Sequence, residues 1–459
     1  MLPGGNAMIV RAAAVVVSLI AGMLFGVPAA AAEVCTAPTP STTQPGYLVA
    51  DPDCDVDGTP FTALPGARTR TGIRDGAAYR IEIPERWNGR LVLYAHGYRG
   101  TGTTVYVGSP DLRQHYVSNG YAWAASSYAT NGYDVGQGVR DSYALIGLFK
   151  EVTGHSARKV YMTGDSMGGH ITAVAIEEYP RAFAGAMPTC GVLGDVELFD
   201  YFLDASVTAA ALAGVPTSFP VEPAAWAAQV AQIKPALGLP APLTGAGQVW
   251  SDVVERRSGG ERPGFESSFR YWNTAQQGGL PFLFSVNPAT SGGTAGIAPG
   301  NLTDNRHTFY RATDKAWPTA VEWQLNRDVL RVRRTAVADP GLAGVPRIDG
   351  RPPVPVLSLH GIGDLFVPFS MEQEYAREAR RNGRSHLFVS RAIRDVAHCG
   401  FALAERQRGF DDLVRWVETG RRPAGDAILD RRAVASASFG CRFTEAVRPL
   451  FVAPACPAR

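Results

Sequence analysis

The sequence predicts an α/β fold in which a mostly parallel sheet carries helices on both faces and a large cap is inserted. Short β-branched apolar runs alternate with helical segments, as they do in β-α units. A serine flanked by glycines stands at one strand-to-helix turn. About two hundred residues separate that turn from a later strand that runs into an aspartate, Asp364. This is far more than two β-α units need.

The first thirty-two residues have the pattern of a signal peptide. Arg11 precedes an apolar stretch over residues 12–27, which is followed by Pro28 and an alanine-rich run to Ala32. This order matches a basic n-region, an apolar h-region and a small-residue cleavage site. A membrane anchor is the alternative, but the apolar core is short for a span. We therefore expect residues 1–32 to be removed and the protein to be secreted to the extracellular space.

Residues 33–74 are rich in proline, glycine, threonine and aspartate, and they predict an irregular N-terminal arm. Asp53, Asp55 and Asp57 within it have the first spacings of a calcium loop, but the twelfth position is Leu64 rather than a bidentate glutamate. A solvated turn is favoured over a calcium site. The sequence predicts no cofactor and no metal site in the rest of the chain.

The first part of the catalytic core is expected over residues 75–193. Its candidate nucleophile is Ser166, the only serine with glycines at both minus two and plus two, namely Gly164 and Gly168. Small neighbours let the backbone bend sharply and leave the hydroxyl exposed. Residues 159–162 predict a buried strand before this turn, and a helix is predicted directly after it. Further core elements are expected as strands at 78–83, 91–95 and 121–127 and a helix at 137–152.

A later strand and a later loop offer an acid and a base. The strand at 354–359 runs into Asp364, and His398 follows the last strand. A serine hydroxyl needs a histidine to take its proton, and a buried carboxylate fixes the tautomer of that histidine. Asp364 is the predicted acid and His398 the predicted base. Asp195, which follows a strand at 183–189, is the alternative acid.

The order of nucleophile, acid and base, with an upstream strand ending in His96-Gly97, resembles the α/β-hydrolase-fold serine hydrolases over residues 75–420. The resemblance implies that the backbone N–H groups of Met167 and Tyr98 form the oxyanion hole. Tannase-like and feruloyl esterases also carry a cysteine beside the catalytic histidine, but theirs pairs with a cysteine just before the serine. This chain has Asp165 there, so the resemblance does not extend to that subgroup.

The six cysteines are expected to form disulfides, because the extracytoplasmic space permits them. Six cysteines allow fifteen pairings. Closeness in the sequence favours Cys35 with Cys54 and Cys441 with Cys456, which leaves Cys190 with Cys399. The last bridge would hold the histidine loop against the sheet.

An inserted cap is expected over residues 194–328, with helical stretches such as 195–207 and 224–233. The second part of the core is expected over 329–420, and residues 421–459 predict a tail held by its disulfide. The cap is rich in aromatic residues, which are interpreted as its own core or, alternatively, as the lining of an acyl or aryl pocket above Ser166. These residues are Phe265, Phe269, Tyr271, Trp272, Phe282, Phe284, Trp317 and Trp323.

The favoured function is a secreted serine hydrolase that cleaves carboxylic esters through an acyl-enzyme. A serine exopeptidase of the same fold is the alternative, and its carboxylates for a substrate amine would be Glu261, Glu266, Asp304 and Glu322. A non-catalytic protein is disfavoured because all three triad residue types are present. The expected partner is a small or lipid-like ester, without a membrane anchor after signal cleavage. The net charge of +2 argues against nucleic acid, and the sequence indicates no oligomeric state.

Overall fold

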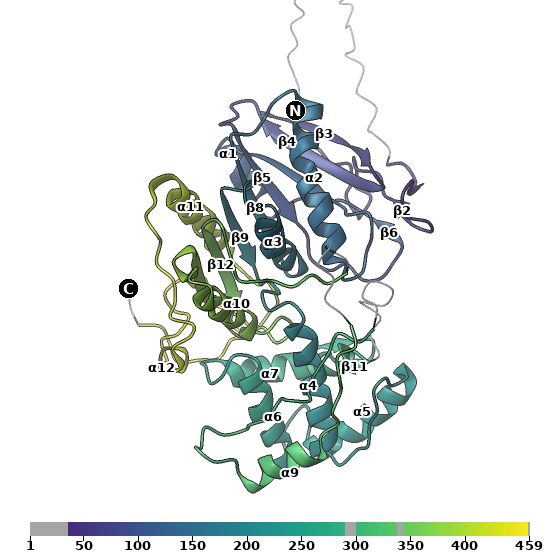
Figure 1. Ribbon diagram of the computed structural model, residues 1–459, viewed down its shortest axis with the longest axis vertical. Coiled ribbons are helices and arrows are strands. Elements are labelled where there is room, and N and C mark those ends of the chain that lie inside the picture. The colour runs from purple at the N-terminus through teal and green to yellow at the C-terminus, as the bar shows by residue number, and fades with distance from the viewer. Residues whose placement is uncertain (1–34, 290–299, 337–341, 343, 458–459) are drawn as a thin grey trace, which may run out of the picture. The chain divides into compact units, whose positions relative to one another are not determined.

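The computed structural model describes residues 35–289, 300–336, 342 and 344–457 (Figure 1). Residues 35–459 form one compact unit. The predicted signal peptide lies outside the described residues, so its removal stays a prediction. Within the part of the chain that is described, no helix is both long enough and apolar enough to cross a bilayer.

An eight-stranded sheet forms the centre of the unit, and its spatial order is β13-β12-β9-β8-β5-β7-β4-β3. β4 runs antiparallel to both of its neighbours, and the other pairs are parallel. This order, with one reversed strand next to the edge, confirms the predicted α/β-hydrolase fold. The strands are β3 (Ala67–Arg74), β4 (Ala77–Pro84), β5 (Arg90–Ala95), β7 (Ala122–Ser126), β8 (Lys159–Asp165), β9 (Gly185–Thr189), β12 (Val356–Gly361) and β13 (Phe388–Ile393).

The N-terminal arm is more regular than the sequence predicted. β3 pairs with β4 along its whole length, from Ala67 opposite Pro84 to Arg74 opposite Ala77. Most of its side chains are exposed or half-buried, so this edge strand lacks the apolar alternation that marks a strand in sequence. A small second sheet joins β1 (Thr39–Pro40), β2 (Leu48–Val49) and β6 (Thr104–Val105).

Alternate residues of the parallel strands face two helical layers. Leu91 and Leu93 belong to the core cluster under one layer, whereas Val92 between them belongs to the cluster under the other. This alternation follows from the two-residue period of a strand. The first layer holds α2 (Val135–Thr153), α3 (Met167–Glu178) and α10 (Ser370–Arg381), and the second holds α1 (Arg113–Ser118) and α11 (Leu403–Thr419).

A helical insertion (residues 197–328) lies between β9 and β12 in the chain, in the lower half of Figure 1. It has a core of its own around Trp226, Trp250 and Phe284, which are fully buried. The cap boundaries at 194 and 328 stay a prediction. Its helices are α4 (Glu197–Leu212), α5 (Pro223–Leu237), α6 (Gly245–Arg257), α7 (Phe265–Thr274), α8 (Phe282–Ser285) and α9 (Ala320–Asp328), and a short hairpin joins β10 (Gln276–Gln277) to β11 (Leu280–Pro281).

The C-terminal tail is attached to the core by more than its disulfide. It contains one short helix, α12 (Arg431–Val434). Arg448 lies 2.5 Å from the carboxylate of Asp395 and 2.7 Å from that of Glu405. These ion pairs join the tail to the loop that follows β13 and to the first turn of α11.

Candidate active site

Ser166 occupies a sharp turn between β8 and α3. Its backbone has φ 59° and ψ −121°, a conformation that L-residues adopt only where the surrounding structure enforces it. A Cβ at Gly164 would approach the carbonyl oxygen of Gly168 to 2.2 Å, and a Cβ at Gly168 would approach that of Ala95 to 2.0 Å. Both flanking glycines are therefore required sterically. This geometry is that of a nucleophile elbow.

Asp364 and His398 form a hydrogen-bonded pair. Nδ1 of His398 lies 2.6 Å from Oδ2 of Asp364, and the Asp364 side chain is fully buried. The other carboxylate oxygen accepts hydrogen bonds from the backbone N–H groups of Phe366 at 2.9 Å and Val367 at 3.1 Å. A carboxylate at Nδ1 places the proton of the neutral imidazole there, which leaves Nε2 as the acceptor.

A disulfide ties the histidine loop to the end of β9, which adjoins Ser166. Cys399, directly after His398, is bonded to Cys190, directly after β9. Two backbone hydrogen bonds tie this end of β9 to the elbow: Ser166 N donates to Thr189 O at 3.0 Å, and Val192 N donates to Ser166 O at 3.3 Å. Nε2 of His398 is buried and has no hydrogen-bond partner among the described residues. The histidine loop is thus tied to the strand end that adjoins the elbow, and no hydrogen bond joins His398 to Ser166 among the described residues. Catalytic hydrogen bonds often close only when substrate binds.

The three disulfides are those the sequence favoured: Cys35–Cys54, Cys190–Cys399 and Cys441–Cys456.

Two segments place backbone N–H groups near Ser166. Met167 is the first residue of α3, where N–H groups have no intrahelical acceptor. Gly97 lies against the elbow, because a Cβ there would come within 3.1 Å of the Ser166 Cβ. Tyr98 follows Gly97 directly. The oxyanion role of Met167 and Tyr98 stays a prediction that this placement supports.

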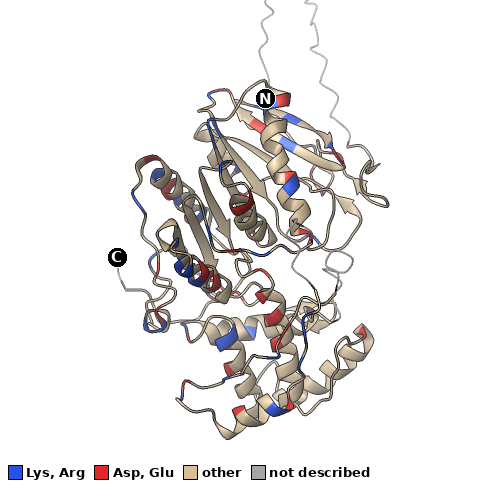
Figure 2. Cartoon of the chain, in the orientation of Figure 1, with Lys and Arg blue, Asp and Glu red and all other residues tan. Residues whose placement is uncertain are grey.

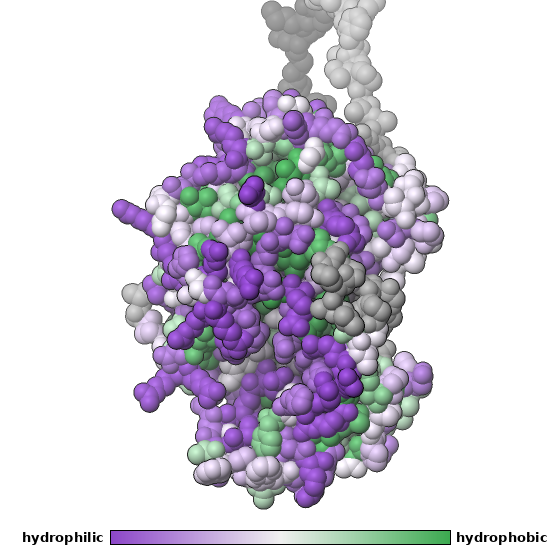
Figure 3. Space-filling model, in the orientation of Figure 1, coloured by the Kyte–Doolittle hydropathy of each residue, from purple (hydrophilic) through white to green (hydrophobic). Residues whose placement is uncertain are grey.

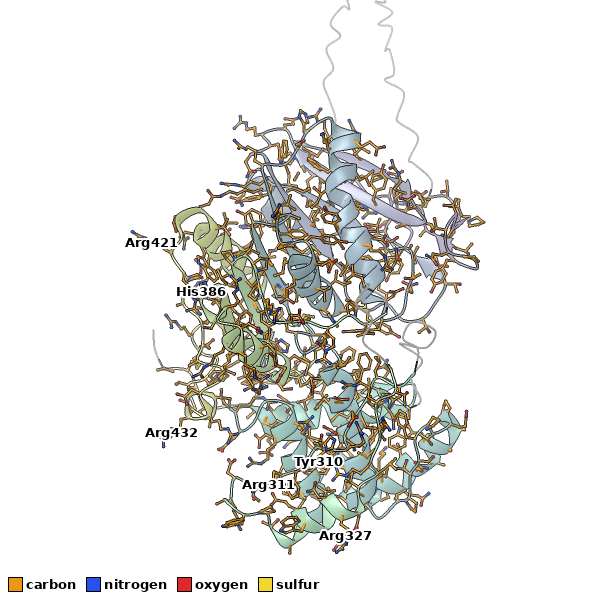
Figure 4. The ribbon with its side chains drawn as sticks, in the orientation of Figure 1. Tyr310, Arg311, Arg327, His386, Arg421 and Arg432 are labelled. Carbon is orange, nitrogen blue, oxygen red and sulfur yellow. A yellow bond between two sulfur atoms is a disulfide. The ribbon has the colours of Figure 1, made fainter. Side chains whose placement is uncertain are left out.

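His96 shapes the turn before Tyr98. Its Nδ1 lies 2.7 Å from Gly97 O and its Nε2 3.1 Å from Ser127 O, and its ring stacks on Tyr128 at 4.0 Å. Burial lowers the pKa of His96 to about 3, so the ring is neutral near pH 7. The histidines at 155, 307 and 386 are exposed, and Figure 4 shows His386 at the edge of the molecule.

His360 is another buried histidine near the site. Its Nε2 lies 2.8 Å from Val367 O. Burial would lower the pKa of His360, but the Glu372 carboxylate, 3.3 Å from its Nδ1, raises that pKa overall. This ring therefore supports the turn that carries Asp364.

Asp195, the alternative acid, is engaged elsewhere. Its carboxylate lies 3.0 Å from Nε of Arg347 and accepts a hydrogen bond from Ile348 N at 2.9 Å. Of the two candidate acids, only Asp364 contacts His398.

The aromatic residues of the insertion divide between two roles. Phe265, Phe269, Trp272 and Phe284 are buried in its core, whereas Trp317 is 83% exposed. Trp272 also reaches the site, since its indole N–H lies 3.1 Å from Gly363 O and 2.9 Å from Val396 O.

An aromatic wall adjoins the base. The ring of Phe366 lies 4.9 Å from that of His398, with Phe282 at 4.8 Å and Phe202 at 6.0 Å from Phe366. Phe202 and Phe366 were not among the residues singled out from the sequence. Burial of four of the predicted aromatic residues supports the interpretation as the insertion's own core, and the pocket above Ser166 stays a prediction.

The four carboxylates suggested for amine capture share no common partner. Glu322 is buried and caps α9, and its pKa is lowered to about 2; burial opposes this, but hydrogen bonds from the backbone N–H groups of Thr319, Ala312 and Thr313 outweigh it. Asp304 pairs with Arg306, and Glu266 pairs with Arg270. Glu261 lines a groove that contains no predicted site residue.

That groove, of about 1000 Å³, lies between α6, residues 309–315 and α10, and seven arginines and one lysine contribute to its lining. Figure 2 shows both charge signs along α10, and this face is largely hydrophilic (Figure 3). Five of the arginines have carboxylate partners: Arg256 with Asp314, Arg257 with Asp204, Arg311 with Glu322, Arg377 with Glu374 and Arg381 with Glu378.

The aspartates of the N-terminal arm also have separate partners. Asp55 pairs with Arg80 at 2.7 Å, Asp53 accepts from Thr71 and Asp57 accepts from Thr59. In the described chain, the one cluster with metal-ligand geometry is Cys190, His398 and Cys399, whose sulfurs are already bonded to each other. The favoured interpretation of the arm as a turn is consistent with these partners.

Comparisons with known proteins give limited overlap. No protein-family model matches the chain. An o-phthalyl amidase from Xanthobacter agilis is 34% identical over 89 residues, and this match spans 19% of this chain and 19% of that relative. Among solved structures, feruloyl esterase B from Aspergillus oryzae covers 80% of this chain and 83% of its own at 17% identity, with a TM-score of 0.46. An acylaminoacyl peptidase from Pyrococcus horikoshii covers 77% of this chain and 41% of its own at 11% identity, with a TM-score of 0.38. The fold assignment rests on the strand order.

Proposed function

We propose that this α/β-hydrolase-fold chain is a secreted serine hydrolase that cleaves carboxylic esters through an acyl-enzyme on Ser166. The observation that carries the proposal is the hydrogen bond between the buried carboxylate of Asp364 and His398, whose loop is tied by Cys190–Cys399 to the strand end that adjoins Ser166. These are the three groups that acyl transfer to a serine requires.

The proposed reaction begins when Oγ of Ser166 attacks the substrate carbonyl carbon while Nε2 of His398 takes its proton. Asp364 holds the N–H of Nδ1 and stabilises the imidazolium that forms. The N–H groups of Met167 and Tyr98 would meet the negative charge on the carbonyl oxygen. The imidazolium then protonates the leaving alkoxide, and a water molecule activated by His398 releases the acid.

Ester substrates are favoured over peptides with a free amino end. Capture of such an amine needs gathered carboxylates, and three of the four candidates are each engaged by a different partner. The aromatic wall of Phe366, Phe282 and Phe202 beside the base is suited instead to an apolar or aromatic group. The proposed substrate is a small or lipid-like ester.

Amide cleavage is the second candidate, because the partial match is to a protein named o-phthalyl amidase. Turnover of p-nitrophenyl acyl esters, acyl anilides and aminoacyl anilides by the same preparation separates the possibilities. We expect esters to have the highest kcat/KM by at least about tenfold, since an alkoxide leaves more easily than an amine. A preference for acyl anilides would favour the amidase, and one for aminoacyl anilides would favour the exopeptidase.

Secretion is supported by the predicted signal peptide and the three disulfides. The test is the N-terminal sequence of the protein recovered from the medium of cells that express the full chain. We expect it to begin directly after Ala32. Recovery of an uncleaved chain from the membrane fraction would favour the anchor instead.

A further inference from the structure

Asp165 and Cys399 are the chain neighbours of the two residues that must meet in the proposed reaction. Asp165 immediately precedes Ser166, and Cys399 immediately follows His398. One side chain contacts both: Arg406, on α11, lies 2.7 Å from Oδ1 of Asp165 through one terminal nitrogen and 3.3 Å from Cys399 O through the other. A single guanidinium thus spans the nucleophile turn and the base loop.

The guanidinium is held in place on several sides. Its side chain is only 8% exposed, and it lies 5.0 Å above the ring of Phe401. It also donates to Thr189 Oγ1 at 3.1 Å. Burial would lower the pKa of Arg406, but Asp165 raises it overall, so the charge persists.

The carboxylate of Asp165 is fixed as well. Beyond Arg406, one oxygen accepts a hydrogen bond from Thr189 and the other accepts one from the hydroxyl of Tyr94 at 3.2 Å. Burial raises the pKa of Tyr94 well above its usual value, so that hydroxyl remains a donor. The Asp165 end of the contact is therefore rigid.

The base loop needs such a support. Cys399 has φ 60°, a left-handed conformation that is unfavourable for a residue with a Cβ. Its disulfide to Cys190 restrains the side chain, and hydrogen bonds restrain the backbone. The Cys399 carbonyl accepts hydrogen bonds from Phe401 N at 2.8 Å and from Arg406, and Arg448 donates to the carbonyl of the next residue, Gly400, at 3.0 Å. The imidazole of His398 is attached one residue away.

We propose that Arg406 is a positioning residue: with Asp165 and the carbonyl of Cys399, it sets the distance between Ser166 and His398. The inference rests on the proposed function, because it assigns a role within that reaction. The contact also cancels the charge of Asp165, which would otherwise oppose the oxyanion that forms nearby.

The test compares two ion pairs, each of which has one member on α11. Asp412 of α11 pairs with Arg391 at 2.5 Å, and its side chain is 16% exposed, as is that of Asp165. Asp165→Asn and Asp412→Asn should both lower the Tm. Only Asp165→Asn should lower kcat for a p-nitrophenyl ester, by about tenfold or more, with KM changed less than about twofold. Equal losses of kcat in both variants would overturn the proposal.

Variants of Arg406 give a second measurement. Arg406→Met should lower kcat by about ten- to a hundredfold, and Arg406→Lys should recover part of this, because an ammonium restores the charge but not the forked contact. Wild-type kcat in Arg406→Met would overturn the proposal. If Arg406→Met does not fold, the same conclusions follow from Arg406→Lys against Asp412→Asn.

The pH profile separates positioning from mere stability. Asp364, from the turn after β12, is the charged group hydrogen-bonded to His398. The charged groups around the histidine loop are Arg406, which contacts Cys399 O and pairs with Asp165 and Asp111, and Arg448, which contacts Gly400 O and pairs with Asp395. Arg406→Met leaves a carboxylate unpaired, so the acid limb of kcat/KM should move to higher pH. Asp165→Asn leaves a cation unpaired, so the limb should move to lower pH. If the acid limb of the kcat/KM profile stayed at the wild-type pH in both variants, the proposed role of the Arg406–Asp165 contact would be contradicted.

The same ester assay distinguishes failure of the proposed function from failure of the proposed role of Arg406. Ester hydrolysis that survives Ser166→Ala would remove the proposed function itself. An inactive Ser166→Ala beside a fully active Arg406→Met would remove only the role of Arg406.

Discussion

Nδ1 of His398 lies 2.6 Å from Oδ2 of Asp364, although 34 residues separate them in the chain. Each side chain is presented by a loop at the same edge of the sheet, one after β12 and one after β13. The carboxyl ends of parallel strands meet at one edge, which explains how residues so far apart converge. Nε2 of His398 has no hydrogen-bond partner among the described residues, as the proposed reaction requires.

Removal of any member of the proposed triad should abolish most activity. Ser166→Ala, His398→Ala and Asp364→Asn are each expected to lower kcat by roughly two to four orders of magnitude, because the three groups act as a unit. Circular dichroism should show an unchanged fold. Asp195→Asn is the matched control; near-normal activity in Asp364→Asn with loss in Asp195→Asn would transfer the acid role.

The Cys190–Cys399 disulfide should matter for turnover as well as for stability. Replacement of both cysteines by serine is expected to cost about 2–5 kcal/mol of unfolding free energy and to lower kcat with little change in KM. Serine replacement of Cys441 and Cys456 is the control, since that bridge lies in the tail. Comparable kcat losses in the two double variants, measured below both melting temperatures, would argue against a specific role for the first bridge.

The backbone at Gly97 should be sensitive to one methyl group. Gly97→Ala would place a Cβ 3.1 Å from the Ser166 Cβ and 3.2 Å from Asp165 O, so Tyr98 N or the elbow must shift. We expect kcat to fall by about ten- to a hundredfold. Gly102→Ala, in the same loop but with no atom within 4 Å of the new Cβ, should behave as wild type. Full activity in Gly97→Ala would separate this turn from the oxyanion hole.

Protonation of His96 should destabilise the protein in acid. Its pKa is about 3 in the folded state and 6.5 by its ordinary value, so the unfolded chain binds the proton more strongly between these limits. The contribution of neutral His96 to the free energy of unfolding is fully present above pH 6.5 and is lost as pH falls toward 3. In His96→Gln, the loss of unfolding free energy between about pH 8 and about pH 5 should be smaller by about 2 kcal/mol. Urea unfolding measures this, with the exposed His386→Gln as control; equal losses in all three proteins would contradict it.

Much of the proposed site could be predicted because its signals are local. The glycines around Ser166 and the strand ends before Asp364 and His398 are short patterns with a direct steric or topological cause. The strand order of the sheet then confirmed the fold that these motifs resembled.

Contacts between distant segments could not be predicted in the same way. Arg406 and Asp165 are 241 residues apart, and nothing in either local sequence specifies the other as its partner. Trp272 was recognised as an aromatic residue of the insertion, but its bonds to Gly363 and Val396 depend on how α7 packs against the site. The edge strand β3 escaped notice because its pairing uses backbone groups and buries few side chains.

Labelling with a fluorophosphonate tests the central claim most directly, because the reagent forms a covalent bond with an activated serine. Mass mapping of the labelled protein should place one adduct on Ser166, and the adduct should be absent from Ser166→Ala and strongly reduced in His398→Ala. Absence of labelling in a folded, ester-hydrolysing preparation, or an adduct on another serine that persists in Ser166→Ala, would contradict the account.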